Sequence, residues 1–369
     1  MSRTWGTWLI VALALAPVVL VAAGVGAWPA GPAGWLDLAG RLSGVLGLAC
    51  LLLAGAVSVR APGFDRPFGG LTRLWQLHHR LGLASFLLIL AHPLLMALAR
   101  APLSPAAMLG ALLPTDGSLR GWALAAGWIG LLAMMAFLAP SFQLFGLPEY
   151  QRWKALHFVS GLAMVAALVH ALPLTGSLSP AAAAVLWGSL GTLAVGVFLW
   201  RALAGRAVLR KPWRVVENRA LADRVAQLFL EPEDGGPPLV HEPGQFVYLT
   251  PHDPGLRAGR DEEHPYTISS APGAPRLEIT VKALGDASSA LLDVAEDSRA
   301  SVEGPYGGFL PPRPGGRRQL WIGGGIGITP FVSAARSRAA GGGGGGRGDT
   351  VLINCANDPT RAYFLEALQ

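Results

Sequence analysis

The sequence predicts a multi-pass α-helical membrane domain of six helices, then a small antiparallel β-barrel and a partial, doubly wound α/β nucleotide-binding lobe. Only 14% of the 369 residues are charged, against about 25% in soluble domains, and charges become frequent only from Arg201 onward. Long apolar runs fill the part before Arg201, and short β-rich runs and a glycine-rich turn follow it. We therefore predict domains over residues 1–205, 210–315 and 316–369.

Six apolar runs are long enough to cross a bilayer, which takes about 20 residues. The runs cover residues 7–26, 36–59, 75–98, 120–141, 153–172 and 181–203. The first run follows Arg3 and ends at Gly24-Val25-Gly26, so it also resembles a cleaved secretory signal. Its length and the five later runs favour a membrane span.

Lys and Arg lie mainly on one side of these spans, and such a bias places the basic side in the cytoplasm. The other side carries mainly Arg41, Arg100 and Arg120. We expect both termini and the soluble domains on the cytoplasmic side. The basic side carries Arg3, Arg60, Arg66, Arg73, Arg80, Arg152, Lys154, Arg201, Arg206, Arg210 and Lys211.

Cysteine count and charge exclude several classes of protein. Cys50 and Cys355 are the only cysteines, so a disulfide-rich scaffold and a four-cysteine iron–sulfur cluster are excluded. Membrane topology accounts for much of the net charge of +6. We therefore expect this protein to contact membrane lipid and not to bind nucleic acid.

Four histidines in the apolar half form two pairs of equal spacing. His79 and His92 are 13 residues apart, as are His157 and His170, so each pair spans about 20 Å of helix. The third and fifth predicted helices run in the same direction. His79 is therefore expected to face His157 near the cytoplasmic side, and His92 to face His170 near the outer side. Facing neutral imidazoles are what bis-histidine ligation of two b-type haems requires.

The inner ligand on the third helix is either His79 or His78. Thirteen residues leave two side chains about 140° apart around an ideal helix, whereas the fourteen between His78 and His92 leave about 40°. The equal spacing on both helices favours His79. The alternative to haem ligation is a polar bundle core in which the histidines bond to backbone or to one another. Arg41 is expected either to contact a haem propionate or to snorkel to the interface.

Residues 212–312 contain short β-rich runs separated by Gly and Pro, as in a small antiparallel barrel. The runs are Arg214–Glu217, Val225–Glu231, Gln245–Thr250, Tyr266–Ser269 and Leu277–Lys282.

Two segments of this region suit a flavin. The first is His264-Pro265-Tyr266-Thr267. Its tyrosine ring can stack on an isoalloxazine, the Thr267 hydroxyl can reach the N5 edge of that ring system, and His264 can pair with phosphate. The second segment offers amides, a cation and hydroxyls for a pyrophosphate. Each alone also reads as an ordinary strand and turn, but their order and spacing favour a flavin site. The second segment comprises Thr280, Val281, Lys282, Gly285 and Ser288.

A glycine-rich turn follows the predicted strand Leu320-Trp321-Ile322 and opens a helix. Glycines let the backbone approach a pyrophosphate, and a helix N-terminus favours anions. We expect Thr329 as the N-cap and Pro330 as the first helical residue. The turn comprises Gly323, Gly324, Gly325, Ile326 and Gly327. A linker at Gly341–Gly346, a strand at Val351–Asn354 and a helix at Arg361–Gln369 follow, which predicts an incomplete lobe.

Together these motifs resemble the ferric reductase and NADPH oxidase superfamily, in which a six-helix haem domain is joined to a ferredoxin-reductase-type FAD and NADPH domain. The resemblance also includes Gly285-Asp286 and Gly304-Pro305-Tyr306-Gly307. It implies that Asn354-Cys355-Ala356-Asn357-Asp358 lies near the adenosine ribose, which makes Cys355 a candidate cofactor-binding residue.

The resemblance implies a plasma (inner) membrane enzyme that passes electrons from NADP or NAD in reduced form, through FAD and two haems, to a small-molecule acceptor. A ferric chelate is the favoured acceptor and oxygen the second, because Met96 stands where the oxidases carry a further histidine. In relatives the nicotinamide lobe continues with a Cys-Gly-Pro turn and an aromatic terminus, which this sequence does not show. The alternative function is therefore a membrane electron-relay subunit that needs a protein partner for its nicotinamide site.

A third possibility, a haem-free membrane anchor for a flavoprotein, is disfavoured by the matched spacing of the histidines.

Overall fold

A computed structural model describes residues 4–61, 63–141, 150–176, 178–310, 318–341 and 350–368. The chain divides into two units. The first comprises Met1–Val59 and Arg73–Ala204, and the second comprises Arg60–Thr72 and Gly205–Gln369. The segment Arg60–Thr72, which joins two membrane helices along the chain, therefore belongs to the second unit.

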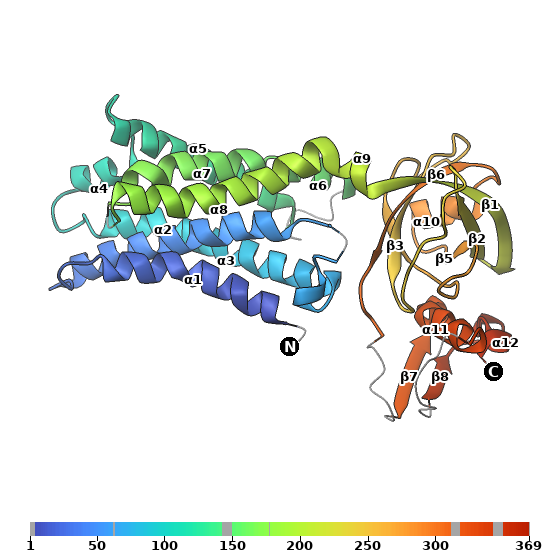
Figure 1. Cartoon of the computed structure of the whole chain (residues 1–369). Coiled ribbons are helices and arrows are strands. Elements are labelled where there is room, and N and C mark those ends of the chain that lie inside the picture. Colours follow the sequence, from blue (N-terminus) through green and yellow to red (C-terminus); the bar gives the residue numbers. More distant parts are fainter. Residues whose placement is uncertain are drawn as a thin grey trace. The chain divides into compact units, whose positions relative to one another are not determined.

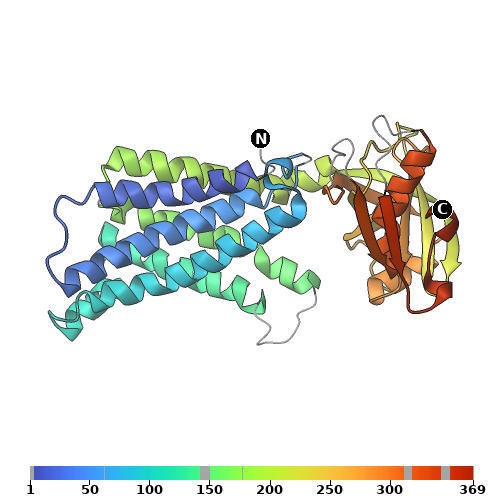
Figure 2. The same ribbon diagram turned by 90° about the horizontal axis from the view of Figure 1, so that it is seen from below.

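The first unit is a bundle of long helices that lie side by side (Figures 1 and 2). Six helical spans in the described residues are long and apolar enough to cross a membrane, as predicted. The fourth span includes the short helix η2 (Ala139–Ser141), and the sixth extends beyond Trp200. The helices are α1 Trp5–Ala23, α2 Pro32–Val57, α3 Leu71–Leu98, α5 Leu119–Leu138, α6 Tyr150–His157, α7 Ser160–Leu174 and α8 Pro180–Trp200.

Serine caps mark where several of these helices begin. The hydroxyls of Ser118 and Ser179 accept hydrogen bonds from the backbone N–H groups of Gly121 and Ala182, each at 3.2 Å. Ser104 caps the helix α4 (Pro105–Leu112) in the same way. This short helix lies between two predicted spans, where the sequence predicts a loop.

The fifth predicted span is interrupted directly after a candidate ligand. α6 ends at His157 and α7 begins at Ser160. Between them the N–H groups of Phe158 and Val159 bond to carbonyls only three residues back, at 3.2 and 3.0 Å. This step is tighter than the four-residue step of an α-helix, so His157 and His170 do not share one regular helix.

The second unit contains the predicted barrel as a curled antiparallel sheet of order β4-β3-β6-β1-β2-β5. A bridge between Ile268 and Ile279 joins its two edges, and the core between them includes Leu228, Leu230 and Val247. Strand β6 was not predicted, because small and polar residues and Pro305 interrupt its apolar pattern. The strands are β1 Arg210–Ala222, β2 Val225–Pro232, β3 Phe246–Pro251, β4 His264–Thr267, β5 Leu277–Lys282 and β6 Arg299–Tyr306. Helix α10 (Asp286–Ala290) follows β5.

The nucleotide lobe contains the two predicted strands, and they pair in parallel. β7 (Gln319–Gly324) leads through the short helix η6 (Gly325–Ile328) into α11 (Thr329–Ala339), and β8 (Thr350–Cys355) follows. Trp321, Phe331 and Tyr363 form part of the small core on one face of this sheet. The predicted last helix is limited to α12 (Leu365–Leu368). Residues 342–346 of the predicted linker lie outside the described residues.

Candidate functional site

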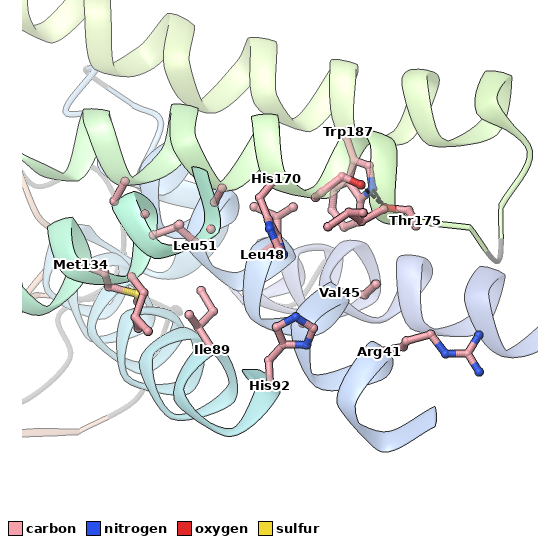
Figure 3. A pocket seen from close by; sticks show the side chains of 18 of the residues that line it. Arg41, Val45, Leu48, Leu51, Ile89, His92, Met134, His170, Thr175 and Trp187 are labelled. Atoms are coloured by element: carbon pink, nitrogen blue, oxygen red, sulfur yellow. Dashed lines mark hydrogen bonds between the residues drawn. The ribbon is translucent and has the colours of Figure 1, made fainter. Parts of the chain in front are cut away.

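Two histidines of the first unit face each other across a cavity (Figure 3). His92 extends from α3 and His170 from α7, with ring centroids 6.0 Å apart and planes at 78°. The cavity is largely apolar, and Arg41 lies at one side of it (Figure 3). Further residues that line the cavity include Val45, Leu48, Leu51, Ile89, Met134 and Trp187. The structure thus brings together the two histidines that the sequence predicts as the outer pair.

Backbone carbonyls orient both rings. His92 Nδ1 lies 2.7 Å from the carbonyl oxygen of Gly40 on α2, and His170 Nδ1 lies 2.9 Å from that of Ala123 on α5. Because a carbonyl only accepts, each Nδ1 carries the proton. The Nε2 atoms are thereby left as the possible metal ligands.

Glycines make room for these two rings. A Cβ at Gly44 would lie 2.7 Å from His92 Nδ1, and a Cβ at Gly127 would lie 2.6 Å from His170 Nδ1. Both distances are shorter than Cβ atoms tolerate. Each glycine stands one helical turn after the residue that accepts the ring's hydrogen bond, so two helices present the same local arrangement.

The second histidine pair is formed by His78 and His157. Their ring centroids are 6.2 Å apart, and His78 Nδ1 lies 2.9 Å from the carbonyl oxygen of Ala54. His79 is exposed on the surface of α3, so the structure places His78 rather than the predicted His79 next to His157, and the identity of the inner haem ligand stays a prediction. The fourteen-residue spacing of His78 and His92 keeps both side chains near one face of α3.

The facing imidazoles fit haem better than a metal held by protein alone. The described residues contain no group of three or more His, Cys, Asp or Glu side chains that could hold a metal ion. Two axial imidazoles suffice for haem, because the porphyrin supplies the other ligands. The buried Nδ1 of His157 has no hydrogen-bond partner among the described residues. Arg41 pairs with Asp37 at 3.0 Å, and both predicted roles of Arg41 stay predictions.

The first predicted flavin segment forms β4 at one edge of the sheet. Tyr266 pairs with Val247 of β3 and packs against the barrel core. Burial raises the pKa of the Tyr266 phenol well above its ordinary value, so the ring is neutral. Pro265 is exposed, and His264 Nε2 lies 3.3 Å from a carboxylate oxygen of Glu262. Thr267 is the last residue of β4 and is half-buried.

The second predicted flavin segment is only partly accessible. Thr280 and Val281 are buried, and the Thr280 hydroxyl lies 3.0 Å from that of Ser269. Lys282 is half-buried. The Ser288 hydroxyl accepts from the backbone N–H of Gly285 at 3.0 Å. Among these side chains Lys282 is therefore the one best placed for an anion.

The glycine-rich turn lies next to Lys282. A Cβ at Gly325, where φ is +51°, would lie 3.9 Å from Lys282 Nζ. Gly323 leaves space for Ile328, since a Cβ there would lie 2.7 Å from the Ile328 side chain. Helix α11 begins at Thr329, so the predicted N-cap is wrong: Ile328 is the N-cap, and Pro330 falls in the first turn.

Residues of the turn and of β8 meet at the ends of the two parallel strands. Gly324 is paired with Cys355, which is exposed. Gly327 is exposed, Ile326 is half-buried, and the Thr329 hydroxyl donates to the Ile326 carbonyl at 3.1 Å. Cys355 therefore lies beside the turn, where the resemblance predicts the adenosine ribose.

One face of the β7–β8 sheet is bare in the described part of the chain. The exposed fractions of Leu320, Ile322, Val351 and Ile353 are 61, 61, 59 and 46%. Parallel sheets ordinarily have both faces covered. This face of the sheet is therefore uncovered among the described residues, and the predicted incompleteness of the lobe stays a prediction.

A buried polar cluster beside the flavin segment was missed by the sequence analysis. We name it the Arg60 cluster. Burial alone would lower the pKa of the Arg60 guanidinium, but the charges of Glu263 and Glu303 outweigh burial and raise it. Burial also raises the pKa of Tyr248. No sequence spacing links Arg60 to residues about 200 positions away. The cluster comprises Arg60, Arg210, Tyr248, Glu263, Glu303 and Tyr306.

Family models match both units. Residues 43–168 match the ferric reductase like transmembrane component, and residues 235–309 match an FAD-binding domain. Both matches agree with the resemblance to the ferric reductase and NADPH oxidase superfamily. The two matched domains indicate a membrane electron-transfer oxidoreductase with an FAD-binding domain.

The chain is also similar to curated proteins over part of its length. It is 30% identical to a flavohemoprotein of Bordetella pertussis over 162 residues, which are 41% of this chain and 40% of that protein. It is 32% identical over 118 residues to a probable dihydroorotate dehydrogenase B (NAD(+)) electron transfer subunit of Archaeoglobus fulgidus, covering 32% of this chain and 42% of that protein. The chain thus spans less than half the length of these curated relatives.

A solved structure gives a similar partial match. The flavohem-like FAD/NAD-binding domain of nitric oxide dioxygenase from Vibrio cholerae is 24% identical, with a TM-score of 0.36. The match covers 42% of this chain and 66% of that one.

Proposed function

We propose that this protein transfers electrons from NADPH or NADH, through FAD and two haems, to a one-electron acceptor across the membrane. The observation that carries the proposal is the pair of facing histidine sets within the bundle. A bound flavin would supply the conversion of a two-electron hydride donor into a source of single electrons.

The proposed haem ligands are His92 with His170, and His78 with His157. The backbone carbonyls of Gly40, Ala54 and Ala123 hold three of the rings with Nε2 available. The lining around His92 and His170 is mainly apolar, which suits a large apolar macrocycle. These features support ligation of a large planar group by two axial imidazoles.

The proposed flavin and nucleotide contacts lie in the second unit. Tyr266 offers a neutral ring for stacking, Thr267 a hydroxyl, and His264 a group that can pair with phosphate. Lys282 beside Gly325 places a cation at the glycine-rich turn, where a pyrophosphate would find backbone amides.

We favour a ferric or other metal chelate over oxygen as the acceptor. Met96 packs closely against Gly40: a Cβ added at Gly40 would lie 2.8 Å from the Met96 sulfur. An apolar thioether therefore lies near the outer histidine pair, at the position where the oxidases carry a further histidine. The predicted outer loops, residues 27–35, 99–119 and 173–180, contain no His or Cys. A chelate would therefore receive its electron directly at the haem edge rather than at a protein-held metal site.

A second candidate is a membrane electron-relay subunit that depends on a partner for the nicotinamide site. The bare face of the β7–β8 sheet favours it, because a second chain could cover that face. Superoxide production is the alternative outcome for the outer acceptor. We place the protein in the plasma (inner) membrane with its second unit in the cytoplasm, since the basic loops lie on that side.

Visible spectra of the purified protein, recorded without oxygen, test the proposal. NADPH is added first and dithionite second. We expect haem bands that are reduced by NADPH. Bands that respond only to dithionite would support the relay subunit, and a protein without a Soret band would contradict both haem-based functions.

A further inference from the structure

The Arg60 cluster places an arginine from the segment Arg60–Thr72 inside the flavin-binding unit. The exposed fractions of Arg60, Glu263 and Glu303 are 6, 5 and 2%. Burial of charged groups is unfavourable unless they are paired and hydrogen-bonded. The cluster therefore depends on each charge having its partner.

Arg60 contacts both buried carboxylates. Its Nη2 donates to Glu263 at 3.0 Å and to Glu303 at 3.3 Å, and its Nε lies 3.2 Å from the second oxygen of Glu303. Arg210 donates to Glu263 at 2.5 Å. Two arginines thus balance two glutamates, and the guanidinium of Arg60 also lies 4.3 Å from the centre of the Tyr248 ring.

Each glutamate directly precedes a motif of the sequence analysis, and the motif after Glu263 is the first predicted flavin segment. Glu263 precedes His264, the first residue of β4, and Glu303 precedes Gly304-Pro305-Tyr306-Gly307. The Tyr306 hydroxyl lies 2.7 Å from the Arg60 carbonyl oxygen and 2.9 Å from Glu303. Strand β3 lies between the two segments and pairs with β4 and β6.

We propose that Arg60 is a positioning residue for the flavin, because it holds Glu263 and Glu303 and thereby fixes β4, which carries the first flavin segment, relative to β6 on the other side of β3. This inference rests on the proposed FAD site. Without Arg60 both buried carboxylates would lose a cation that hydrogen-bonds to them, and Arg210 would stay close to both. Repulsion or entering water would then displace the start of β4 or the end of β6.

The test is an FAD titration of the full-length protein in detergent after the flavin has been removed. Flavin fluorescence reports binding, and the Soret band reports an intact haem domain. We expect Arg60→Met to weaken FAD binding about tenfold or more, because a buried carboxylate loses its partner. Arg66→Met is the matched control, since Arg66 is exposed on the same segment; its dissociation constant is expected to equal that of the unchanged protein.

A double variant separates charge pairing from simple loss of bulk. Arg60→Met with Glu303→Gln leaves one arginine and one glutamate in the cluster, so we expect much of the FAD affinity to return. Equal affinity in Arg60→Met and the unchanged protein, or no recovery in the double variant, would overturn the inference. Failure of the unchanged protein to bind FAD would instead refute the proposed function and this inference with it. If the single variant does not accumulate, recovery of protein by the second substitution supports the charge argument, and loss of both variants overturns it.

Discussion

At the scale of single residues, the position of a ring nitrogen decides which histidines can serve a metal. His78, His92 and His170 each place Nδ1 against a main-chain carbonyl of a neighbouring helix. The acceptor residues Gly40 and Ala54 are fourteen positions apart on α2, the same spacing that separates His92 from His78 on α3. The two sites are therefore built by one arrangement used twice along a pair of helices.

This arrangement predicts different outcomes for two adjacent histidines. His78→Leu should reduce the haem content from two per chain to one, because it removes a ring that faces His157. His79→Leu is the matched control and should retain both haems, since His79 is exposed. Haem is quantified against protein by the pyridine haemochrome spectrum. Loss of haem in the His79 variant, together with full haem content in the His78 variant, would restore His79 as the ligand.

The glycines beneath the rings give a second prediction. Gly127→Ala should lower the occupancy of the outer haem, because its Cβ would lie 2.6 Å from His170 Nδ1 and force the ring to move. Gly188→Ala is the control, since nothing lies within 4 Å of a Cβ at that helical position. Redox titration followed in the α-band distinguishes one haem from two. Identical titrations for the two variants would show that His170 is not held against Gly127.

Sequence reasoning found the histidine pairs but not which neighbour on α3 faces inward. Both spacings fit a helix, and equal spacing on two helices was the only criterion that favoured His79. The fifth span is interrupted after His157, so its thirteen residues do not describe a regular helix and cannot be transferred to α3. The Arg60 cluster could not be predicted from the sequence for another reason. Its ion pairs join residues some 200 positions apart, and such pairs depend on the fold rather than on local spacing.

At the scale of elements, the length of apolar runs and the β-rich composition of short runs are the reliable signals. All six spans, five of the six barrel strands and both lobe strands follow from them, with bounds shifted by a few residues. Strand β6 was not predicted because a charged residue, Glu303, is among its buried residues, and Gly304-Pro305 interrupts its apolar pattern. Glu303 and Tyr306 both lie on β6, so the missed strand carries part of the Arg60 cluster.

Helix α11 is fastened to the barrel by a buried brace. Arg336 Nη1 donates to Glu278 at 2.6 Å and to the Ser269 carbonyl at 2.9 Å, and the Ser333 hydroxyl donates to the Ser270 carbonyl at 2.7 Å. Glu278 is 6% exposed. The brace therefore joins the nucleotide lobe to the strand end that follows the flavin segment.

Removing the brace should destabilise the second unit. Arg336→Met leaves Glu278 buried without its cation, a change that costs about 3 kcal/mol and lowers the thermal unfolding midpoint by about 6 to 12 °C. Arg299→Met is the control, because Arg299 pairs with Glu233 at an exposed position and such pairs contribute little. Differential scanning fluorimetry of flavin fluorescence measures both variants. Equal midpoints would show that α11 is held by its apolar contacts alone.

At the scale of the whole molecule, the division into units does not follow the order of the chain. The segment Arg60–Thr72 leaves the bundle after α2, belongs to the flavin-binding unit, and returns as α3. It follows the end of α2 and reaches the start of α3, the two helices that orient and carry proposed ligands. Sequence hydropathy treats this segment as a loop between spans, and only the three-dimensional contacts assign it to the other unit.

Membrane orientation is the last prediction, and the two cysteines provide its test. Cys50 is buried within α2 and Cys355 is exposed at the end of β8. Because the basic loops should face the cytoplasm, an impermeant maleimide should label Cys355 in inverted vesicles and leave it unlabelled in right-side-out vesicles. Cys355→Ser removes the accessible thiol and should abolish labelling in both preparations, whereas Cys50→Ser should leave the pattern unchanged. Labelling from the outside alone would place the flavin-binding unit on the opposite side and reverse the direction of electron transfer proposed for the two histidine pairs.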